Sequence, residues 1–345
     1  MTTEPDVAAR RRVRRRSLGR AAVVGLVLGG VGFGSFLVPV PFVFEYLPGP
    51  VRDVSELVEI SSARTYSSEG SLYLTTVSVD TDVTLVEMLL SAVDTDKVVV
   101  LESQVTGGSS LEHLQEAQKR EMESSKEYAR TVAIGAAGLG RPQGDGARVV
   151  SVQQGSPADG VLEQGDVIVA VGESRTATTC DVGAAVVAGE IGETVSVTVE
   201  REGRRRRLSL ETIAAPSNPV TPYLGIMIED INYRFESDVR VNFDTGRIAG
   251  PSAGLMLSLA LYDRLTRDDL SSGRKIAGTG TITCDGEVGP IGGVEQKVAG
   301  AEQKGAEVFL SPAANAEAAR SSADTIEIVA VSSFQDALDY LEPPS

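Results

Sequence analysis

Hydrophobic residues follow different patterns along the chain, and each pattern predicts a different structure. Residues 21–44 form an uninterrupted apolar run, long enough as a helix to cross the roughly 30 Å hydrocarbon core of a membrane. Residues 71–79 alternate and are rich in β-branched and aromatic side chains, which predicts a strand. Residues 110–137 carry apolar side chains at helical spacing behind capping serines, which predicts one long amphipathic helix.

From about residue 138 the chain changes to short strands and turns, with a helix near 180–188 and a hairpin turning at Gly203. A proline-rich segment, 215–222, ends this region. After it the sequence predicts strands at 223–230, 238–243, 276–283 and 306–312, and helices at 252–267, 294–305 and 333–341. Strands that alternate with helices indicate an α/β or α+β domain.

The charges around the apolar run predict its orientation in the cell membrane. Residues 1–20 contain seven arginines and two carboxylates, a charge of +5, and the next charged residue is Glu45. We therefore expect a cytoplasmic tail (1–20), a transmembrane helix (21–44) and an extracytoplasmic body. A cleaved signal peptide is the alternative, although its apolar core is usually only about 7–15 residues long. Residues 45–68, which begin with the proline-containing EYLPGPV, are expected to form a linker.

Composition narrows the classes of partner. The chain has a net charge of −16. Because residues 1–20 carry +5, residues 21–345 carry −21, which argues against a nucleic-acid partner.

Cys180, Cys284 and the single histidine cannot supply the usual zinc ligands, so no metal is expected. The two cysteines are interpreted as buried thiols. The arginines at 204–207 are interpreted as a charged strand edge, with contact to anionic lipid as the alternative.

The sequence GPSAG (250–254) has the glycine-x-serine-x-glycine spacing that often presents a nucleophile, here Ser252. An α/β-hydrolase needs a histidine after this serine, and none follows His113. His113 itself lies in the highly charged 110–137 helix and is interpreted as a surface residue. A neutral lysine is a known substitute for histidine as the base that accepts the serine proton.

Of the six lysines, Lys297 has the surroundings that such a base requires. It has Val294, Val298 and Ala301 at one turn's spacing, so it lies on or next to the apolar face of a short helix. Burial disfavours the charged form, and a shift of roughly 3 pKa units would leave the amine largely neutral at pH 7. A lysine buried against a carboxylate for structural reasons is the alternative, and these residues alone leave both interpretations open.

Residues 138–214 resemble a PDZ domain. The resemblance rests on GSPA (155–158), on LEQGDVIVAVGE (162–173) and on the strands of 193–213. It implies a β-rich module that binds an extended peptide, often a C-terminus, along a sheet edge. The expected carboxylate-binding loop is Gly138, Leu139 and Gly140. A module without a ligand is the alternative.

Three further motifs, GPSAG (250–254), GTGTITCDGEVGPIGGVEQKVAGA (278–301) and GAEVFLSP (305–312), together resemble the proteolytic domain of Lon in order and spacing. The resemblance covers 223–342. It also includes 69–131, where EGSLYLTTVSV and EMESSKEYA are similar to that domain's first strand and first helix. The PDZ domain would then be inserted within the protease domain. With its apolar run, the chain resembles the membrane-anchored, PDZ-containing Lon-like proteases of the YlbL type.

The resemblance implies that Ser252 is the nucleophile, that Lys297 is the general base, and that Thr279 holds the lysine amine. The backbone amide of Ala253, at a helix start, is the expected oxyanion donor. Ala249 stands where relatives often have glycine or an acidic residue. The chain contains no phosphate-binding loop of the GxxxxGK[ST] type, so no nucleotide or other cofactor is expected.

These features predict an ATP-independent serine endopeptidase that acts outside the cytoplasmic membrane on unfolded or exposed protein segments. Its PDZ domain would recruit or gate substrate. The resemblance also implies a homo-oligomer, commonly a hexamer among Lon-like domains. A catalytically inactive, membrane-anchored PDZ adaptor is the main alternative, and self-processing of the linker is another. The presence of both Ser252 and Lys297 favours the enzyme.

Overall fold

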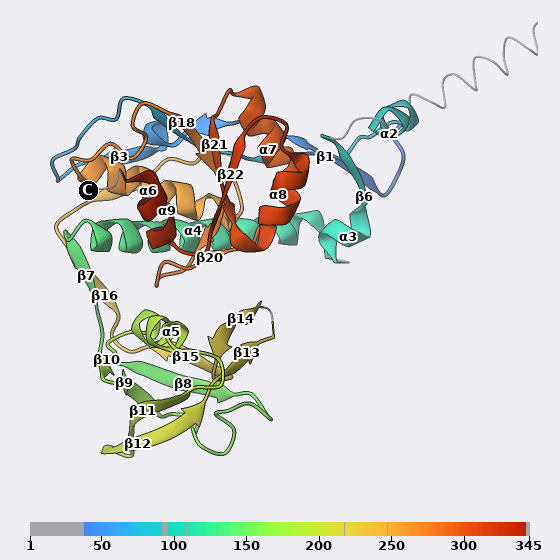
Figure 1. The fold of residues 1–345 in the computed structure, drawn as a ribbon. Coiled ribbons are helices and arrows are strands. Elements are labelled where there is room, and N and C mark those ends of the chain that lie inside the picture. Colours follow the sequence, from blue (N-terminus) through green and yellow to red (C-terminus); the bar gives the residue numbers. More distant parts are fainter. Residues whose placement is uncertain (1–37, 92–95, 108, 217, 247, 343–345) are drawn as a thin grey trace, which may run out of the picture. The chain divides into compact units, whose positions relative to one another are not determined.

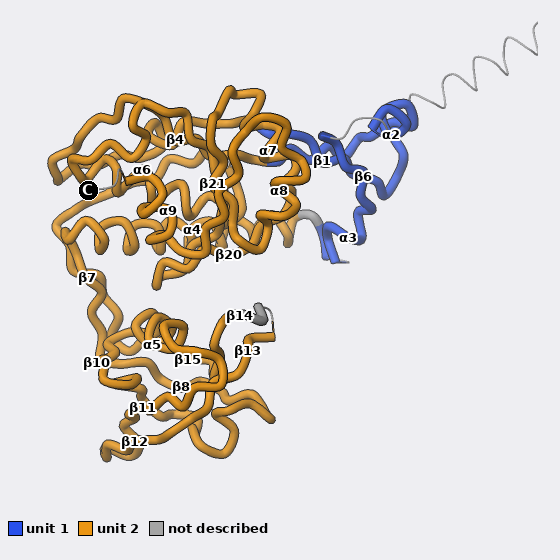
Figure 2. Tube along the Cα trace, viewed as in Figure 1, with its two compact units in different colours: residues 1–49, 77–111 blue, residues 50–76, 112–345 orange. Residues whose placement is uncertain are grey.

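A computed structural model describes residues 38–91, 96–107, 109–216, 218–246 and 248–342 (Figure 1). The chain divides into two compact units, residues 1–49 with 77–111 and residues 50–76 with 112–345 (Figure 2). The expected cytoplasmic tail and residues 21–37 of the expected transmembrane helix lie outside the described residues. No helix in the described ranges is long and apolar enough to cross a membrane.

The first unit contains a three-stranded antiparallel sheet of order β5–β1–β6. Its elements are β1 (Val43–Pro48), β5 (Val77–Asp80), α2 (Leu85–Ser91), β6 (Val98–Leu101) and α3 (Glu102–Thr106). The end of the expected transmembrane helix and the start of the expected linker are therefore strand β1. The prolines of this segment favour an extended backbone, and pairing with two strands from later in the chain makes it part of a sheet.

The second unit is built on a five-stranded sheet of order β2–β4–β18–β21–β22. These strands are β2 (Arg52–Asp53), β4 (Ser71–Leu74), β18 (Lys275–Gly278), β21 (Val308–Pro312) and β22 (Glu327–Val331). All neighbours are parallel except β2 and β4. The single strand expected at 71–79 is thus two strands, β4 and β5, which belong to different units. Because β4 pairs with β18, segments far apart in the sequence form one domain.

Apolar side chains cover both faces of this sheet, as expected for buried parallel strands. Successive residues point to opposite faces: Ile276 and Leu310 join one hydrophobic cluster, whereas Phe309 joins another. The first cluster includes side chains from α4 (Leu111–Ala136), α6 (Gly254–Leu265) and α9 (Phe334–Leu341), and the second includes side chains from α7 (Val294–Gln303) and α8 (Ala316–Ser322). Figure 1 shows α7 and α8 together on one side of the sheet.

Helix α6 is the centre of the first cluster, because residues 254–261 are all buried. A helix that is apolar on every side must lie inside a core. The expected helix at 252–267 is therefore confirmed, preceded by the short 3-10 helix η2 (Pro251–Ala253). The expected helix at 110–137 is confirmed as α4.

Short elements complete the domain around this helix. They are η1 (Val54–Leu57), β3 (Val58–Ile60), β17 (Val241–Phe243), β19 (Thr281–Ile282), β20 (Val288–Gly289) and η3 (Ala313–Asn315). β3 and β17 form one antiparallel pair, and β19 and β20 form a hairpin. Most of the expected linker, 45–68, is therefore structured.

A separate module, residues 140–237, is inserted between α4 and β17. It begins and ends with the antiparallel strands β7 (Gly140–Gln143) and β16 (Arg234–Ser237). Its sheet has the order β12–β11–β9–β8–β15, and β10 pairs with β9. The strands are β8 (Ala147–Val152), β9 (Val167–Val171), β10 (Ser174–Arg175), β11 (Thr194–Arg201), β12 (Arg204–Glu211) and β15 (Ile226–Asp230), with β13 (Ile213–Ala215) and β14 (Asn218–Tyr223) as a further pair.

The module's helix α5 (Thr179–Val187) and its β11–β12 hairpin lie where the sequence predicts them. Strand β15, however, was expected to begin the protease domain. It pairs with β8 at one end of the module's sheet, and Leu224, Ile226 and Ile228 pack in the module's hydrophobic core. The module therefore extends beyond residue 214.

The interpretation of the cysteines as two buried thiols is wrong. Cys180, in α5, and Cys284, between β19 and β20, form a disulfide whose Cα atoms are 5.5 Å apart. The partners are 104 residues apart in sequence, and no local pattern indicates that the fold brings them together.

The extended boundary of the module predicts how fragments of it behave. A fragment of residues 140–237 is expected to unfold cooperatively on heating, whereas residues 138–214 are not. The shorter fragment lacks β15, the buried Leu224, which contributes about 1.5–3 kcal/mol, and the partly buried Ile226 and Ile228, which contribute less. The total stability of a small domain is about 5–15 kcal/mol. Circular dichroism melting curves of the two fragments, with Cys180→Ser in both, test this. Equal cooperative transitions would contradict the boundary.

Candidate active site

Ser252 lies in η2, immediately before the buried helix α6, and the residues of GPSAG explain this turn. Gly250 has φ 91° and ψ 150°, a conformation that glycine adopts at little cost. Pro251 is the first residue of η2, where its fixed φ suits a helix start and its missing N–H is not needed. The backbone therefore turns sharply into the helical segment, and Ser252 lies in its first turn.

Gly254 allows the turn to pack closely against its neighbours. A Cβ atom at this position would lie 2.6 Å from Cγ2 of Ile282 and 2.7 Å from Oγ of Ser125. Ser125 is a buried residue of α4, and its hydroxyl donates a hydrogen bond of 2.9 Å to the carbonyl of Pro251. The long helix α4 thus fixes the residue that precedes the nucleophile.

Thr279 follows the carboxyl end of β18 and is fully buried. Its hydroxyl donates to the carbonyl of Ser252 at 3.1 Å, and the amide of Gly280 donates to the same oxygen at 2.9 Å. In return, the amide of Leu255 donates to the carbonyl of Gly280. Hydrogen bonds therefore join the residues that follow β18 to the segment that contains Ser252, at the carbonyl of Ser252 and at the amide of Leu255. Carboxyl ends of parallel strands are common positions for sites in α/β folds.

Lys297 lies in α7, which is preceded by its N-cap residue Gly293 with φ 65°. The loop before this helix is fixed by Asn315, which accepts a hydrogen bond from the amide of Ile291 and donates one to its carbonyl. Val294, Val298 and Ala301 are buried with the lysine. The side chain of Lys297 thus approaches the site from an apolar helix face and is only 3% exposed.

The structure brings Ser252, Thr279 and Lys297 together. The Lys297 Nζ atom lies 2.8 Å from Oγ of Ser252 and 2.8 Å from Oγ1 of Thr279. Because the Thr279 hydroxyl proton is directed at the Ser252 carbonyl, its oxygen accepts a hydrogen bond from the lysine. A neutral amine can donate one N–H to Thr279 and turn its single lone pair to the Ser252 hydroxyl. This is the arrangement that removal of the serine proton requires.

Burial lowers the pKa of Lys297 from 10.5 to about 7. Desolvation is the cause, because the charged ammonium loses its hydration and gains only two neutral hydroxyls as neighbours. No carboxylate among the described residues offsets this effect on the lysine. Of the two interpretations that the sequence leaves open, the structure therefore favours the neutral amine over a structural ion pair.

The other candidate residues lie in different places. Ala253 is buried in η2, directly after Ser252. Gly138, Leu139 and Gly140 lie where α4 ends and β7 begins, and the amides of Gly138 and Leu139 donate to carbonyls of α4. These two amides cap a helix, so the structure does not place this segment at an open edge of the module's sheet.

His113 is remote from the nucleophile along α4. It lies in the first turn of the helix, and Ser125, which contacts the nucleophile turn, comes twelve residues later. At about 1.5 Å per residue, the two are separated by about 18 Å along the helix axis. Among the described residues, no group of three or more His, Cys, Asp or Glu could hold a metal ion.

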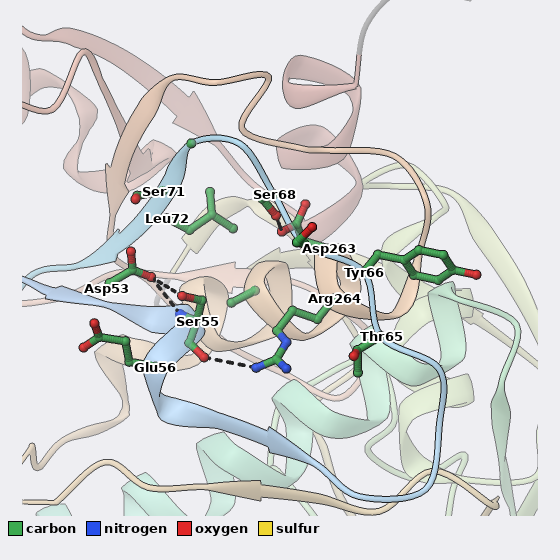
Figure 3. A pocket seen from close by; sticks show the side chains of 13 residues that line it. Asp53, Ser55, Glu56, Thr65, Tyr66, Ser68, Ser71, Leu72, Asp263 and Arg264 are labelled. Carbon is green, nitrogen blue, oxygen red and sulfur yellow. Dashed lines mark hydrogen bonds between the residues drawn. The ribbon is translucent and has the colours of Figure 1, made fainter.

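A cavity of about 480 Å³ is lined by residues near the C-terminal end of α6 (Figure 3), whereas Ser252 precedes the start of that helix. Its lining includes Asp53, Tyr66, Asp263 and Arg264. Asp263 accepts hydrogen bonds from Ser68 and from the amide of Leu270, and burial raises its pKa. Arg264 donates to the backbone carbonyls of Ser55 in η1 and Val58 in β3. These polar groups have partners within the fold, and the cavity includes none of the three residues that meet at Ser252.

A buried lysine amine in contact with a serine at a helix start is the arrangement that the serine–lysine variant of the catalytic triad uses. Comparison with known families agrees with this class. Residues 219–341 match the Lon protease (S16) C-terminal proteolytic domain, and residues 118–212 match the PDZ domain family. The chain thus carries a PDZ domain and a Lon-type proteolytic domain.

Similar proteins include Lon protease 2 of Bacillus subtilis, 37% identical over 31% of this chain and 20% of that protein. Lon protease of Clostridium beijerinckii is 32% identical over 45% of this chain and 18% of that protein. The chain therefore spans about a fifth of the length of these relatives. Among solved structures, the PDZ domain of an SdrC-like protein from Listeria monocytogenes is 24% identical over 24% of this chain and 87% of that chain, with a TM-score of 0.23.

Sequence reasoning missed two features near the site. Ser125 holds the Pro251 carbonyl, and the only signal for it is a polar residue one turn from the buried positions Met122 and Ala129 of an amphipathic helix. The disulfide joins the β19–β20 turn, which follows Thr279 closely, to the inserted module. Its only signal is an even number of cysteines in a chain expected to lie outside the cytoplasm.

The lowered pKa of Lys297 predicts a pH-dependent stability. Between pH 7 and 10.5 the unfolded chain binds a proton that the folded lysine has lost, so stability rises with pH over this range. The expected gain is about 4 kcal/mol at about 1.4 kcal/mol per pKa unit. In Lys297→Met this contribution is absent. Urea unfolding of both proteins at pH 7, 8.5 and 10 measures the difference in unfolding free energy, and a constant difference would show that the lysine is not desolvated.

Proposed function

We propose that this protein is an ATP-independent serine endopeptidase in which Ser252 and Lys297 form the catalytic dyad. The observation that carries the proposal is the 2.8 Å contact between the serine hydroxyl and an amine that burial brings to a pKa of about 7. The match of residues 219–341 to a proteolytic domain supports the same chemistry. The sequence given contains no nucleotide-binding loop of the GxxxxGK[ST] type.

The reaction proceeds by acyl transfer. Neutral Lys297 removes the Ser252 proton as the serine oxygen attacks the peptide carbonyl, and the resulting ammonium then protonates the leaving amine. Thr279 orients the amine throughout. The amide of Ala253, at the start of the helical segment that continues into α6, supports the oxyanion. Water then hydrolyses the acyl-enzyme, and the step uses no cofactor.

The proposed place of action is outside the cytoplasmic membrane, with the N-terminal apolar run as the anchor. The arginine-rich start of the sequence supports this orientation. The Cys180–Cys284 disulfide also supports it, because disulfides persist in oxidising compartments and are rare in the cytosol. The substrates in this proposal are unfolded or exposed protein segments, and the assembly is a homo-oligomer of the kind common among Lon-like proteins.

In this proposal the PDZ module recruits or gates the substrate. Strand β15 is the last strand of the module's sheet, and α5 contacts it. The amide of Thr179, at the start of α5, donates to the Asp230 carboxylate at the end of β15. An extended peptide can add to such an edge through backbone hydrogen bonds. We therefore place peptide binding at β15 rather than at residues 138–140.

The alternative function is an inactive adaptor that retains the fold. It would not need a lysine that costs the folded protein several kcal/mol below pH 7, yet Lys297 and its contacts are present. Self-processing is a special case of the proposed activity, in which a segment of the same chain is the substrate.

The proposal predicts that both dyad residues are essential. Ser252→Ala and Lys297→Ala are each expected to lower kcat/KM on casein, an unfolded protein, by roughly 10³-fold or more without ATP. Lys304→Ala is the matched control, because Lys304 ends the same helix but is exposed. Labelling by a fluorophosphonate should disappear in Ser252→Ala. Equal hydrolysis by the wild type and both dyad variants would disprove the proposal.

The proposal also predicts the pH dependence of catalysis. Because the neutral amine is the base, kcat/KM should rise with pH, with a midpoint near the Lys297 pKa of about 7. Well below this pH, each unit should lower the rate about tenfold. Initial rates on a short fluorogenic peptide from pH 5 to 9 test this. A rate that is flat across pH 7 would exclude Lys297 as the titrating base.

A further inference from the structure

The disulfide between Cys180 and Cys284 joins the inserted module to the protease domain at a point distant in sequence from the backbone connections between them. Cys180 lies in the first turn of α5, in the inserted module, and Cys284 lies in the turn between β19 and β20, in the protease domain. The chain itself enters and leaves the module through the paired strands β7 and β16. The disulfide is thus an additional covalent connection.

The surfaces on either side of the bond also fit each other closely. Gly183 lies one helical turn after Cys180, on the same side of α5. A Cβ atom at Gly183 would lie 3.0 Å from Oδ2 of Asp285, the residue that follows Cys284. A larger side chain at this position would require the Asp285 carboxylate to move. Besides the disulfide, α5 therefore has Gly183 beside the Asp285 side chain of the β19–β20 turn.

The β19–β20 turn is fixed to the protease domain by contacts that do not involve the disulfide. The amide of Thr283 donates to the carbonyl of Glu287, the amide of Val288 to Ser332, and the amide of Phe334 to Gly286. Ile282 is buried in the central cluster. Loss of the disulfide would leave these contacts, and with them the dyad, in place. Its loss would instead remove the covalent link between α5 and the turn, leaving the backbone connection through the two-stranded β7–β16 ribbon and the noncovalent contacts of Tyr233 with α4.

The module carries its open sheet edge next to the disulfide-bonded helix. Helix α5 contacts β15 and is tied to its end through Thr179 and Asp230. On the other side of the bond, β19 contacts the nucleophile turn η2. Through α5 and the disulfide, the β15 edge is therefore covalently linked to the hairpin that follows Thr279.

We propose that the Cys180–Cys284 disulfide is a positioning bond, which holds the peptide-binding edge of the PDZ module so that a long bound substrate is presented to Ser252. The proposal rests on the proposed protease function. Holding the two sites in one geometry raises the effective concentration of the bound segment at the second site. The bond therefore acts on the apparent affinity for long substrates and leaves the chemistry at the dyad unchanged.

Reduction supplies a clean test, because Cys180 and Cys284 are the only cysteines in the sequence. Dithiothreitol adds two electrons and two protons to the disulfide to give two thiols, and is itself oxidised to its cyclic disulfide. On the full chain, we expect reduction to raise KM for casein by about fivefold to tenfold without changing kcat. The Cys180→Ser, Cys284→Ser double variant should behave like the reduced wild type and should not respond to dithiothreitol.

Two readouts separate positioning from a general loss of structure. Hydrolysis of a short fluorogenic peptide and fluorophosphonate labelling of Ser252 should be the same in oxidised and reduced protein. Reoxidation of the wild type should restore the original KM for casein. Thiol titration of the denatured, unreduced protein should find no free thiol, and two free thiols would overturn the proposal.

The outcomes also distinguish this proposal from the proposed function. No Ser252-dependent hydrolysis in either redox state would refute the protease. Ser252-dependent hydrolysis of casein with the same KM before and after reduction would refute the positioning bond alone. A parallel loss of short-peptide hydrolysis and of labelling would also refute it, because the disulfide would then act on the dyad itself.

Discussion

The contact between Ser252 and Lys297 depends on one constraint, which is that a lysine amine must be kept away from water without a carboxylate to neutralise it. Its two neighbours at 2.8 Å are hydroxyl oxygens, which can stabilise a neutral amine but do little for an ammonium ion. The resulting pKa of about 7 makes the lysine a base at neutral pH. Burial thus produces both the reactivity of the site and its cost to stability.

The surrounding fold meets this constraint with several elements from distant parts of the chain. A buried helix presents the serine, the end of a parallel strand presents Thr279, and a helix on the other face of the sheet presents the lysine. The glycines of GPSAG and GTG allow close approach, since a Cβ at Gly278 would lie 2.6 Å from Sδ of Met256. Ser125 adds a contact from α4. The glycines of the GPSAG and GTG motifs are therefore needed for close packing around the site, in addition to the side chains that carry its chemistry.

The inserted module interrupts the protease domain in sequence but not in space, because β4 pairs directly with β18. The module has its own hydrophobic core. The disulfide adds a second connection close to the hairpin that follows Thr279. The PDZ module and the Lon-type proteolytic domain are thereby joined by a covalent contact whose formation depends on the redox compartment.

The sequence by itself predicted the candidate dyad and the long periodic elements. With only one histidine, far upstream, the base had to be sought among the lysines. The apolar spacing around Lys297 made it a candidate, and the resemblance to the Lon proteolytic domain selected it. Helices α4, α6 and α7 followed from local periodicity. Only the tertiary structure placed β15 in the module, made β1 a strand, and paired Cys180 with Cys284 and Ser125 with Pro251. Those outcomes depend on partners many residues away, and a local pattern of side chains carries no information about which distant strand or residue will lie beside it.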